Sequence, residues 1–222
     1  EIIKLNKKNL NSPLRDKFIL SKGHACLCIY VSLFLKKIIN KNDLYNYGKN
    51  NSFLMTHISH KVPGVEFSTG SLGHGLPFAT GKALYAKKFN KNWHTYCLLS
   101  DGELNEGSNW ESLLFSSHHK LNNLTIIVDY NKIQSFGNTN EVINLEPLEE
   151  KFKSMNLDVV RINGHNLKNL FSAFKKKSKT KPKVIIADTI KGYGVDFIEN
   201  KLEWHYKSLT VEQLNSALKI LK

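Results

Sequence analysis

Short apolar runs alternate along this chain with longer segments of helical periodicity. The apolar runs are of strand length, and we expect strands at Phe18–Leu20, Thr95–Leu99, Thr125–Val128, Val159–Ile162 and Val184–Ala187. Helical periodicity predicts helices at Cys26–Lys37, Gly75–Phe89, Asn109–Lys120, Glu146–Met155, Leu167–Lys177 and Val211–Leu221. Such alternation favours right-handed βαβ crossovers. It predicts an α/β fold in which helices cover both faces of a mostly parallel sheet.

The length and composition are those of a globular chain. With 222 residues, of which 41% are hydrophobic, the protein can form a packed core. No internal repeat, long linker or shift in composition divides the sequence, so we expect a single domain over residues 1–222. The first residue is Glu1 rather than Met. This leaves open whether the natural N-terminus is missing.

The net charge is strongly positive. Lys and Arg number 32 against 19 Asp and Glu, which gives +13, a value compatible with nucleic acid, a membrane surface or anionic substrates as partners. Much of the excess lies in tracts such as "FKKKSKTKPK", in a chain also rich in Asn and Ile. Biased nucleotide composition produces this mixture without selection for charge. The charge alone therefore does not identify a partner.

We expect no targeting or membrane segment, and the spacing of the cysteines indicates neither a zinc site nor a set of disulfides. The sequence has no apolar run of eighteen residues and no signal-peptide core at its start. Cys26, Cys28 and Cys97 form a C-x-C pair and a distant single, which fits neither zinc spacing nor an even set of disulfides. We expect free thiols in a cytoplasmic protein.

Oxygen-rich residues follow two neighbouring predicted strands. "LLSDGELNEG" places Asp101, Glu103 and Glu106 after one strand, and "IIVDYNKI" places Asn131 after the next. The carboxyl ends of parallel strands meet at one edge of a sheet, where α/β folds bind ligands. A carboxylate, an amide oxygen and a backbone carbonyl suit a Mg²⁺ that is completed by phosphate oxygens and water. The alternative is that Asp101 and Asn131 only cap a helix and a turn.

Glycines in the same segment favour a phosphate. Gly102 and Gly107 would allow the backbone to approach it closely, and a helix that opens near Ser108 would direct its free N–H groups toward it. No P-loop motif is present, and "GSLGHG" is not a G-x-G-x-x-G fingerprint.

Four ordered segments resemble the transketolase family. "SDGELNEG" followed by "DYNKI" is similar to the family's thiamine diphosphate motif, G-D-G-x-x-x-E-G then D-x-N-K-I, at the same spacing of thirty residues. "RDKFILSKGHA" and "VPGVEFSTGSLGHGLPFATGKAL" are similar to two family segments upstream, and "IKGYGVDFIENKLEWHYK" to one downstream. The matches extend from Arg15 to Lys207. One departure is Ser100, where the family usually has Gly, and we expect only a modest backbone adjustment there.

The resemblance implies a thiamine diphosphate-binding fold and a set of site residues. It implies Asp101, the Asn131 side chain and the Ile133 carbonyl as Mg²⁺ ligands, and the Gly102 backbone as a contact of the diphosphate. It also implies that the Gly70 and Leu72 backbone contacts the aminopyrimidine ring. By the same resemblance, His24 and His205 act near the diphosphate and the reacting carbon, and His57 handles substrate oxygens. Glu106 is implied to join a proton network across a subunit interface. The remaining histidines, His60, His74, His94, His118, His119 and His165, are expected at the surface, in loops or in packing.

The implied activity is transfer of a two-carbon ketol unit from a ketose phosphate to an aldose phosphate. The family's acid that activates the aminopyrimidine lies in a second domain, and its H-P-G-G element lies upstream of "SKGHA"; neither is found in this sequence. The closest resemblance is therefore to the split form, in which a pyrimidine-domain chain is a separate partner in a heterotetramer. Alternatives are a subunit of a 1-deoxyxylulose-5-phosphate synthase or a 2-oxo acid dehydrogenase, or a non-catalytic nucleic-acid binder. Against the last, no set of stacking aromatics on a basic face is evident.

Overall fold

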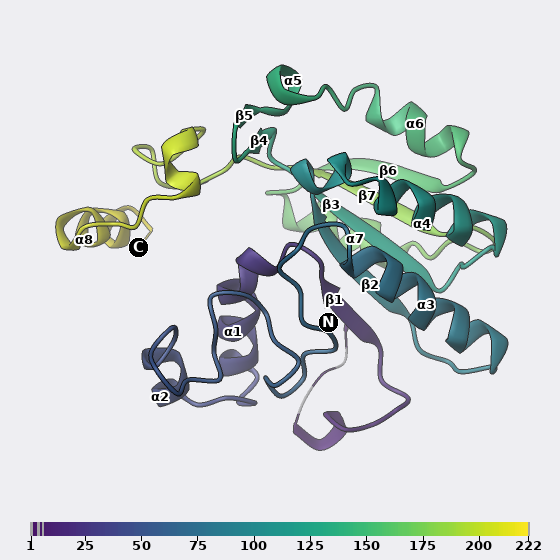
Figure 1. Cartoon of the computed structure of the whole chain (residues 1–222), viewed down its shortest axis with the longest axis horizontal. Coiled ribbons are helices and arrows are strands. Elements are labelled where there is room, and N and C mark those ends of the chain that lie inside the picture. Colours follow the sequence, from purple (N-terminus) through teal and green to yellow (C-terminus); the bar gives the residue numbers. More distant parts are fainter. Residues whose placement is uncertain (1, 4, 6, 222) are drawn as a thin grey trace.

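A five-stranded parallel sheet forms the centre of the molecule (Figure 1). The computed structural model describes residues 2–3, 5 and 7–221. The strands lie in the order β1 (Lys17–Leu20), β2 (Thr95–Ser100), β3 (Leu124–Tyr130), β7 (Lys183–Asp188) and β6 (Asp158–Asn163), with each neighbouring pair parallel. A short antiparallel hairpin of β4 (Ile133–Gln134) and β5 (Gly137–Asn138) follows β3.

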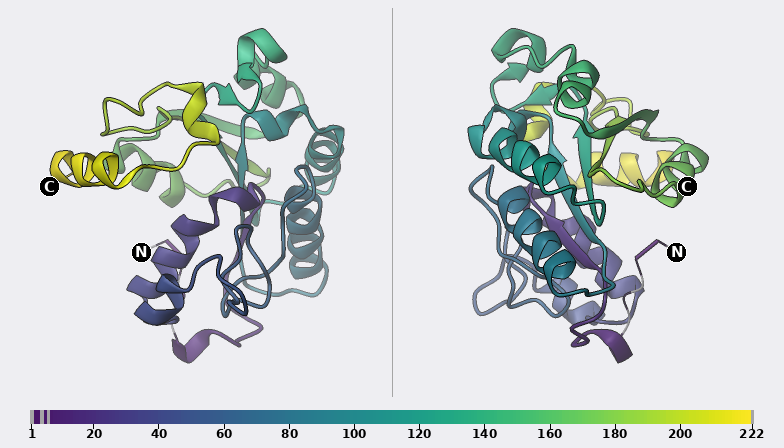
Figure 2. Two further views of the ribbon diagram at one scale, coloured as in Figure 1. Left: turned by 60° about the vertical axis from the view of Figure 1, so that its left-hand side comes forward. Right: turned by 90° about the vertical axis from the view of Figure 1, so that its right-hand side faces the viewer.

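Helices cover both faces of this sheet (Figures 1 and 2). The α-helices are α1 (Cys26–Leu35), α2 (Lys41–Tyr45), α3 (Gly75–Lys88), α4 (Gly107–His118), α5 (Thr139–Val142), α6 (Leu148–Ser154), α7 (Leu167–Lys175) and α8 (Val211–Ile220). Single 3₁₀ turns lie at Lys7–Asn9, Gly23–Ala25, Gly102–Asn105 and Leu202–His205. None of the described helices is both long enough and apolar enough to cross a membrane.

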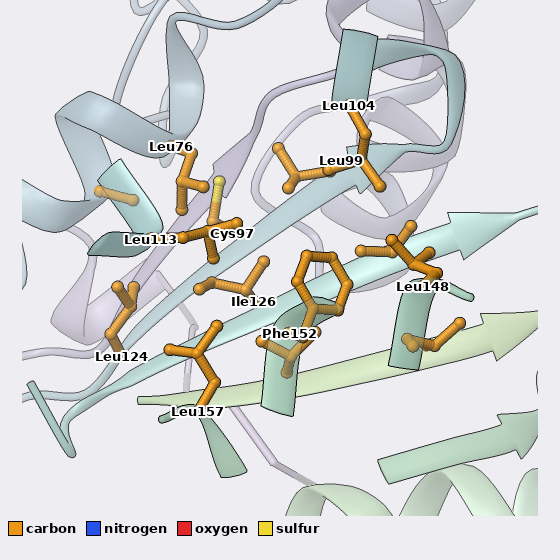
Figure 3. Packing of buried hydrophobic residues seen from close by; sticks show 14 of the residues in the cluster. Leu76, Cys97, Leu99, Leu104, Leu113, Leu124, Ile126, Leu148, Phe152 and Leu157 are labelled. Atoms are coloured by element: carbon orange, nitrogen blue, oxygen red, sulfur yellow. The ribbon is translucent and has the colours of Figure 1, made fainter. Parts of the chain in front are cut away.

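The main core lies between the sheet and α3, α4 and α6 (Figure 3). Alternate strand residues point to opposite faces, so Ile126 and Val128 join this core whereas Ile127 packs on the other side, with Ala173 of α7. The central strands are buried on both faces, which explains why β3 and β7 appear in the sequence as continuous apolar runs. The core fixes the position of the strand ends that carry the site.

The structure confirms the predicted fold class, all five strands and all six helices. The helix predicted from Glu146 begins later, at Leu148, because Pro147 precedes it. Sequence periodicity missed α2, α5 and the β4–β5 hairpin, since each is too short to show a period. The cysteines are free, with Cys26 and Cys97 buried and Cys28 exposed.

Candidate cofactor site

A cavity of about 540 Å³ opens at the carboxyl ends of the strands. Each strand of the large sheet leads into it. Its lining includes Lys22 after β1, Asp101 after β2, Asn131 after β3, Thr189 after β7 and His165 after β6. This is the sheet edge at which open α/β folds bind their ligands.

The structure brings most of the predicted site residues into this one cavity. Its lining contains His24, Gly70, Leu72, Asp101, Gly102, Asn131, Ile133 and His205. His57 and Glu106 are not part of the described lining. His165, expected at the surface or in packing, does line the cavity, and its Nε2 accepts a hydrogen bond of 2.7 Å from the Ile190 N–H.

Asp101 is the buried carboxylate of the site, with only 1% of its surface exposed. Its Oδ1 accepts a hydrogen bond of 2.7 Å from the Gly102 N–H, and its Oδ2 accepts one of 2.5 Å from the Lys132 N–H. Burial raises the pKa of Asp101, and these two backbone hydrogen bonds oppose that rise. A cation beside the carboxylate would favour its ionised form.

The oxygen atoms at this edge fit a magnesium ion. The Asn131 Oδ1 accepts one hydrogen bond of 2.9 Å from the Ile133 N–H, and a carbonyl-type oxygen carries a second lone pair for another partner. Asp101, Asn131 and Ile133 all line the cavity, and between them they carry a carboxylate, an amide oxygen and a backbone carbonyl. Mg²⁺ prefers such hard oxygens and commonly shares its coordination with phosphate.

Two lysines make the cavity suitable for an anion; both lie in segments that resemble the family, but the sequence analysis did not single them out as site residues. The Lys22 Nζ donates to the Asp129 Oδ2 at 2.7 Å, and the Thr189 Oγ1 donates to the Asp129 Oδ1 at 2.5 Å. Burial would raise the pKa of Asp129, but the Lys22 ammonium and these hydrogen bonds hold it below its ordinary value. Lys191 also lines the cavity, and burial lowers its pKa, with Lys22 adding to the effect. An anionic ligand would raise the pKa of Lys191 and so offset the lowering caused by burial and by the charge of Lys22.

The two predicted imidazoles both line the cavity and lie close together, with ring centroids 6.2 Å apart and ring planes tilted by 49°. Burial lowers the pKa of His24 to about 4. The charge of Lys22 and the neighbouring His205, His57 and Lys191 act in the same direction. Burial and the charges of Lys191 and Lys22 also lower the pKa of His205. Both rings are therefore neutral near pH 7, and each can donate a hydrogen bond through one nitrogen and accept through the other.

Close backbone packing places His24 beside the glycine-rich segment. A Cβ on Gly23 would lie 2.5 Å from the Thr69 carbonyl oxygen, so only glycine permits this approach. The Thr69 Oγ1 donates to the Leu20 carbonyl at 2.6 Å and ties the same two segments. The His57 ring lies against Gly70, with its Cδ2 at 3.5 Å from the position of a Gly70 Cβ. His57 thus borders the cavity wall formed by Gly70.

Glu103 connects the loops of the site, a role that the sequence did not indicate. Its side chain is fully buried, and its Oε1 accepts hydrogen bonds from the Ser21 Oγ at 2.5 Å and from the Gly73 N–H at 2.9 Å. Its own N–H donates to the Ser100 Oγ at 3.2 Å. The serine that departs from the family pattern therefore contributes a hydrogen bond to this network.

Glu106 lies outside the cavity, exposed at the start of α4. A Cβ on Gly73 would lie 2.7 Å from the Glu106 Cβ, which places Glu106 beside the glycine-rich loop. We expected Gly107 and the helix that opens near Ser108 to face a phosphate. This expectation is wrong for the cavity lining formed by the described residues, because that lining reaches only Gly102 in this segment. The intervening 3₁₀ turn Gly102–Asn105 separates α4 from the cavity, and the Ser108 Oγ donates to the Gly73 carbonyl instead.

The family model and the relatives that match this chain all point to the same family. The model of the family described as "Transketolase, thiamine diphosphate binding domain" matches residues 1–221. The chain is 40% identical to a subunit of the apulose-4-phosphate transketolase of Actinobacillus succinogenes, over 100% of this chain and 81% of that protein. It is 36% identical to a 6-deoxy-6-sulfo-D-fructose transketolase subunit of a Clostridium species, over 98% of this chain and 80% of that protein.

A solved structure shows the same fold within a longer chain. The transketolase of Campylobacter jejuni superposes with a TM-score of 0.93 at 32% identity, and the match covers 98% of this chain but 36% of that one. The relatives named as subunits, in contrast, are matched over most of their length. The chain therefore belongs to the transketolase family, and it corresponds to the N-terminal, thiamine diphosphate-binding subunit of the split form.

Proposed function

We propose that this chain binds Mg²⁺ and thiamine diphosphate and, with a pyrimidine-domain partner, transfers a two-carbon ketol unit from a ketose phosphate to an aldose phosphate. The observation that supports this best is the cavity itself. It combines the oxygens of Asp101, Asn131 and Ile133 with the ammonium groups of Lys22 and Lys191 at one sheet edge. Neither a plain helix cap nor a plain turn needs this mixture of charges.

In this proposal Asp101, Asn131 and the Ile133 carbonyl hold the Mg²⁺, and the two lysines and the Gly102 backbone bind the diphosphate. Thiamine diphosphate, when bound, supplies a carbanion and an electron sink for breaking and forming the carbon–carbon bond. The chain's own contribution is to bind the charged end of the cofactor. Gly70 and Leu72 border the cavity where the aminopyrimidine ring would lie.

The histidines would handle protons on substrate oxygens. The Lys191 Nζ lies 3.3 Å from the His205 Nδ1, and since an ammonium group only donates, Nδ1 accepts. This leaves the proton of the neutral ring on Nε2, which can donate to a substrate hydroxyl or developing alkoxide. His24 is neutral for the same reason of burial and can serve as a proton acceptor. His57, at the rim beside Gly70, would contact the more distant sugar oxygens.

The partner would complete the site. The acid that activates the aminopyrimidine in the family belongs to a pyrimidine domain, and the relatives named as transketolase subunits support a second subunit for this chain as well. Glu106 is exposed, and in this proposal a neighbouring subunit contacts it in a heterotetramer with two such sites. Closure by the partner would also exclude water from the reacting carbon.

Calorimetric titration with Mg²⁺ and thiamine diphosphate tests the cofactor assignment. Asp101→Asn keeps the shape of the side chain but removes its charge, so we expect Mg²⁺-dependent cofactor affinity to fall roughly tenfold or more. Because the amide NH₂ replaces one of the two oxygens that accept backbone hydrogen bonds, the melting temperature should also fall, and the affinities are compared at a temperature at which both proteins are folded. Glu212→Gln, exposed on α8 and outside the cavity lining, also removes one negative charge and is the control. Equal affinities of the Asp101→Asn variant and the parent would refute the metal assignment.

The partner assignment needs a separate assay. Ketol transfer is measured with this chain alone, with the pyrimidine-domain chain alone and with the mixture, all with Mg²⁺ and thiamine diphosphate. We expect activity only in the mixture. Substantial turnover by this chain alone would contradict the split-subunit proposal, and an assembled but inactive mixture would contradict the proposed transfer reaction.

A further inference from the structure

A second cavity, of about 570 Å³, lies at the opposite end of the sheet from the cofactor site. Lys17, the first residue of β1, and Trp93, two residues before β2, form one side of it. Phe78, Lys82 and Tyr85 of α3 form the other. Figure 1 shows α3 lying along β2, with β1 as the next strand.

Lys17 differs from the other buried lysines of the described chain. Lys17, Lys22 and Lys183 are only 7%, 7% and 4% exposed. Lys22 is paired with Asp129, and the Lys183 Nζ donates to the carbonyl oxygens of Ala173 and Lys176. For Lys17 the described residues provide neither an ion pair nor a side-chain hydrogen bond; its Nζ lies 5.2 Å from the centroid of the Trp93 ring. The Lys17 Nζ is not among the fully buried atoms that lack a hydrogen-bond partner, so the ammonium group of this largely buried side chain reaches solvent at the cavity and can bind a ligand there.

The nearby acids are already engaged. Glu66 forms an ion pair with Arg15, and the Asp16 Oδ1 accepts a hydrogen bond of 2.8 Å from the His94 N–H. Lys82 places a second ammonium group at the cavity. Burial lowers the pKa of Lys17, and Arg15 and Lys82 add to this, while Glu66 and Asp16 oppose it. The charges around the cavity therefore leave an excess of positive charge for an anion to neutralise.

The walls are aromatic and leave room for a flat group. Tyr85 and Trp93 have nearly parallel rings, 8° apart with centroids separated by 5.9 Å, and the Lys82 Nζ lies 5.3 Å from the centroid of Phe78. Gly81 borders the same space, and a Cβ built there would meet no atom within 4 Å. Aromatic walls favour stacking or edge contacts with a planar ring.

We propose that this cavity binds a small aromatic carboxylate, with the carboxylate between the ammonium groups of Lys17 and Lys82 and the ring against Tyr85 and Trp93. Charge-assisted hydrogen bonds to the carboxylate give Lys17 the oxygen partner that the chain itself does not supply. The ring fills the space that Gly81 leaves open. The site is separate from the cofactor cavity and does not depend on the function proposed for that cavity.

The indole N–H resonances of the ¹⁵N-labelled protein report on binding. The Trp93 Nε1 is buried without a hydrogen-bond partner, whereas the Trp110 and Trp204 Nε1 groups donate to the carbonyls of Leu104 and Phe197. Titration with benzoate should shift the Trp93 resonance saturably, with a dissociation constant in about the millimolar range, and leave the other two unshifted. Inorganic phosphate, which lacks the ring, and benzyl alcohol, which lacks the charge, should each bind roughly tenfold more weakly.

Two variants test the cause of any shift. Lys17→Met removes the ammonium group, and Gly81→Leu fills the cavity while favouring the helix, so both should abolish saturable benzoate binding. Lys91→Gln, an exposed lysine in the loop before Trp93, is the control and should bind like the parent. The melting temperatures of both variants are measured as well, so that a loss of binding through unfolding is recognised. No saturable Trp93 shift in the parent, or equal benzoate affinity in all variants, would overturn the proposal.

Discussion

The hydroxyl of Ser21 donates a hydrogen bond of 2.5 Å to the carboxylate of Glu103, across 82 positions of sequence. Because Glu103 also binds the Gly73 N–H, this one carboxylate joins the loop after β1, the glycine-rich loop and the loop after β2. Those three loops carry His24, Leu72 and Asp101 into the cofactor cavity. The geometry of the cavity thus rests on a residue that does not line it.

Replacing Glu103 should loosen these loops. Glu103→Ala leaves buried donors of Ser21 and Gly73 without a partner, so we expect a loss of about 2–3 kcal/mol in the free energy of unfolding and weaker cofactor binding. Glu103→Gln keeps an acceptor oxygen and should lose about half as much. Urea unfolding and calorimetry measure the two effects. Glu111→Gln, exposed on α4, is the control, and similar stability of Glu103→Ala and this control would contradict the role of Glu103.

Gly23→Ala should disturb the approach of the His24 loop to Thr69. The added Cβ would lie 2.5 Å from a backbone oxygen that cannot rotate away, so we expect destabilisation of about 1–3 kcal/mol. Because the displaced segment carries His24, cofactor affinity should fall as well. Gly107→Ala is a control at which a Cβ meets nothing within 4 Å. Thermal unfolding of the two variants side by side measures the difference, and the prediction fails if they melt alike.

His94 should make stability fall on acidification. Burial lowers its pKa from the ordinary 6.5 to about 4, and its Nε2 lies 2.8 Å from the Thr125 Oγ1. Between these two pKa values the unfolded chain binds a proton that the folded chain does not, so the stabilisation is present above pH 6.5 and is lost as the pH falls toward 4. The loss is at most about 3 kcal/mol.

His94→Gln isolates this contribution, because His24 titrates in the same direction and is present in both proteins. The free energy of unfolding, measured by urea titration at a series of pH values, should fall less steeply on acidification in the variant. Parallel pH profiles of parent and variant would show that His94 does not contribute.

The charge of +13 should produce only non-specific nucleic-acid binding. Phosphate contacts by scattered lysines release counterions, so any affinity for RNA or DNA should be weak, indifferent to sequence and steeply reduced by salt. Fluorescence anisotropy with unrelated oligonucleotides at low and physiological salt measures this. A sequence-selective complex that persists at physiological salt would contradict it.

The strands, and the edge at which the site lies, could be predicted from local sequence. Apolar runs identify buried strands, and parallel order brings Asp101 and Asn131 to one edge without knowledge of any distance. The resemblance to a family added residues whose spacing alone says little, such as His24 and His205. Both kinds of prediction depend on patterns that are short in sequence.

The hydrogen bonds between distant segments could not be predicted in this way. Lys22 and Asp129 lie within recognisable motifs, but their ion pair joins positions 107 apart and is evident only once the strand order is known. Glu103 is one of three acids after β2, yet nothing local distinguishes a buried carboxylate from an exposed one. The 3₁₀ turn that moves Ser108 away from the cavity has no periodic signal at all.

The strand order has a consequence for the chain as it is synthesised. β3 pairs with β7, and β6 pairs with the other side of β7, so the apolar strand β3 keeps an open edge until residues 183–188 have been made. Translation of the intervening segment takes on the order of 3–10 s at about 5–20 residues per second. During that interval the unpaired edge of the nascent sheet is open to aggregation with other chains.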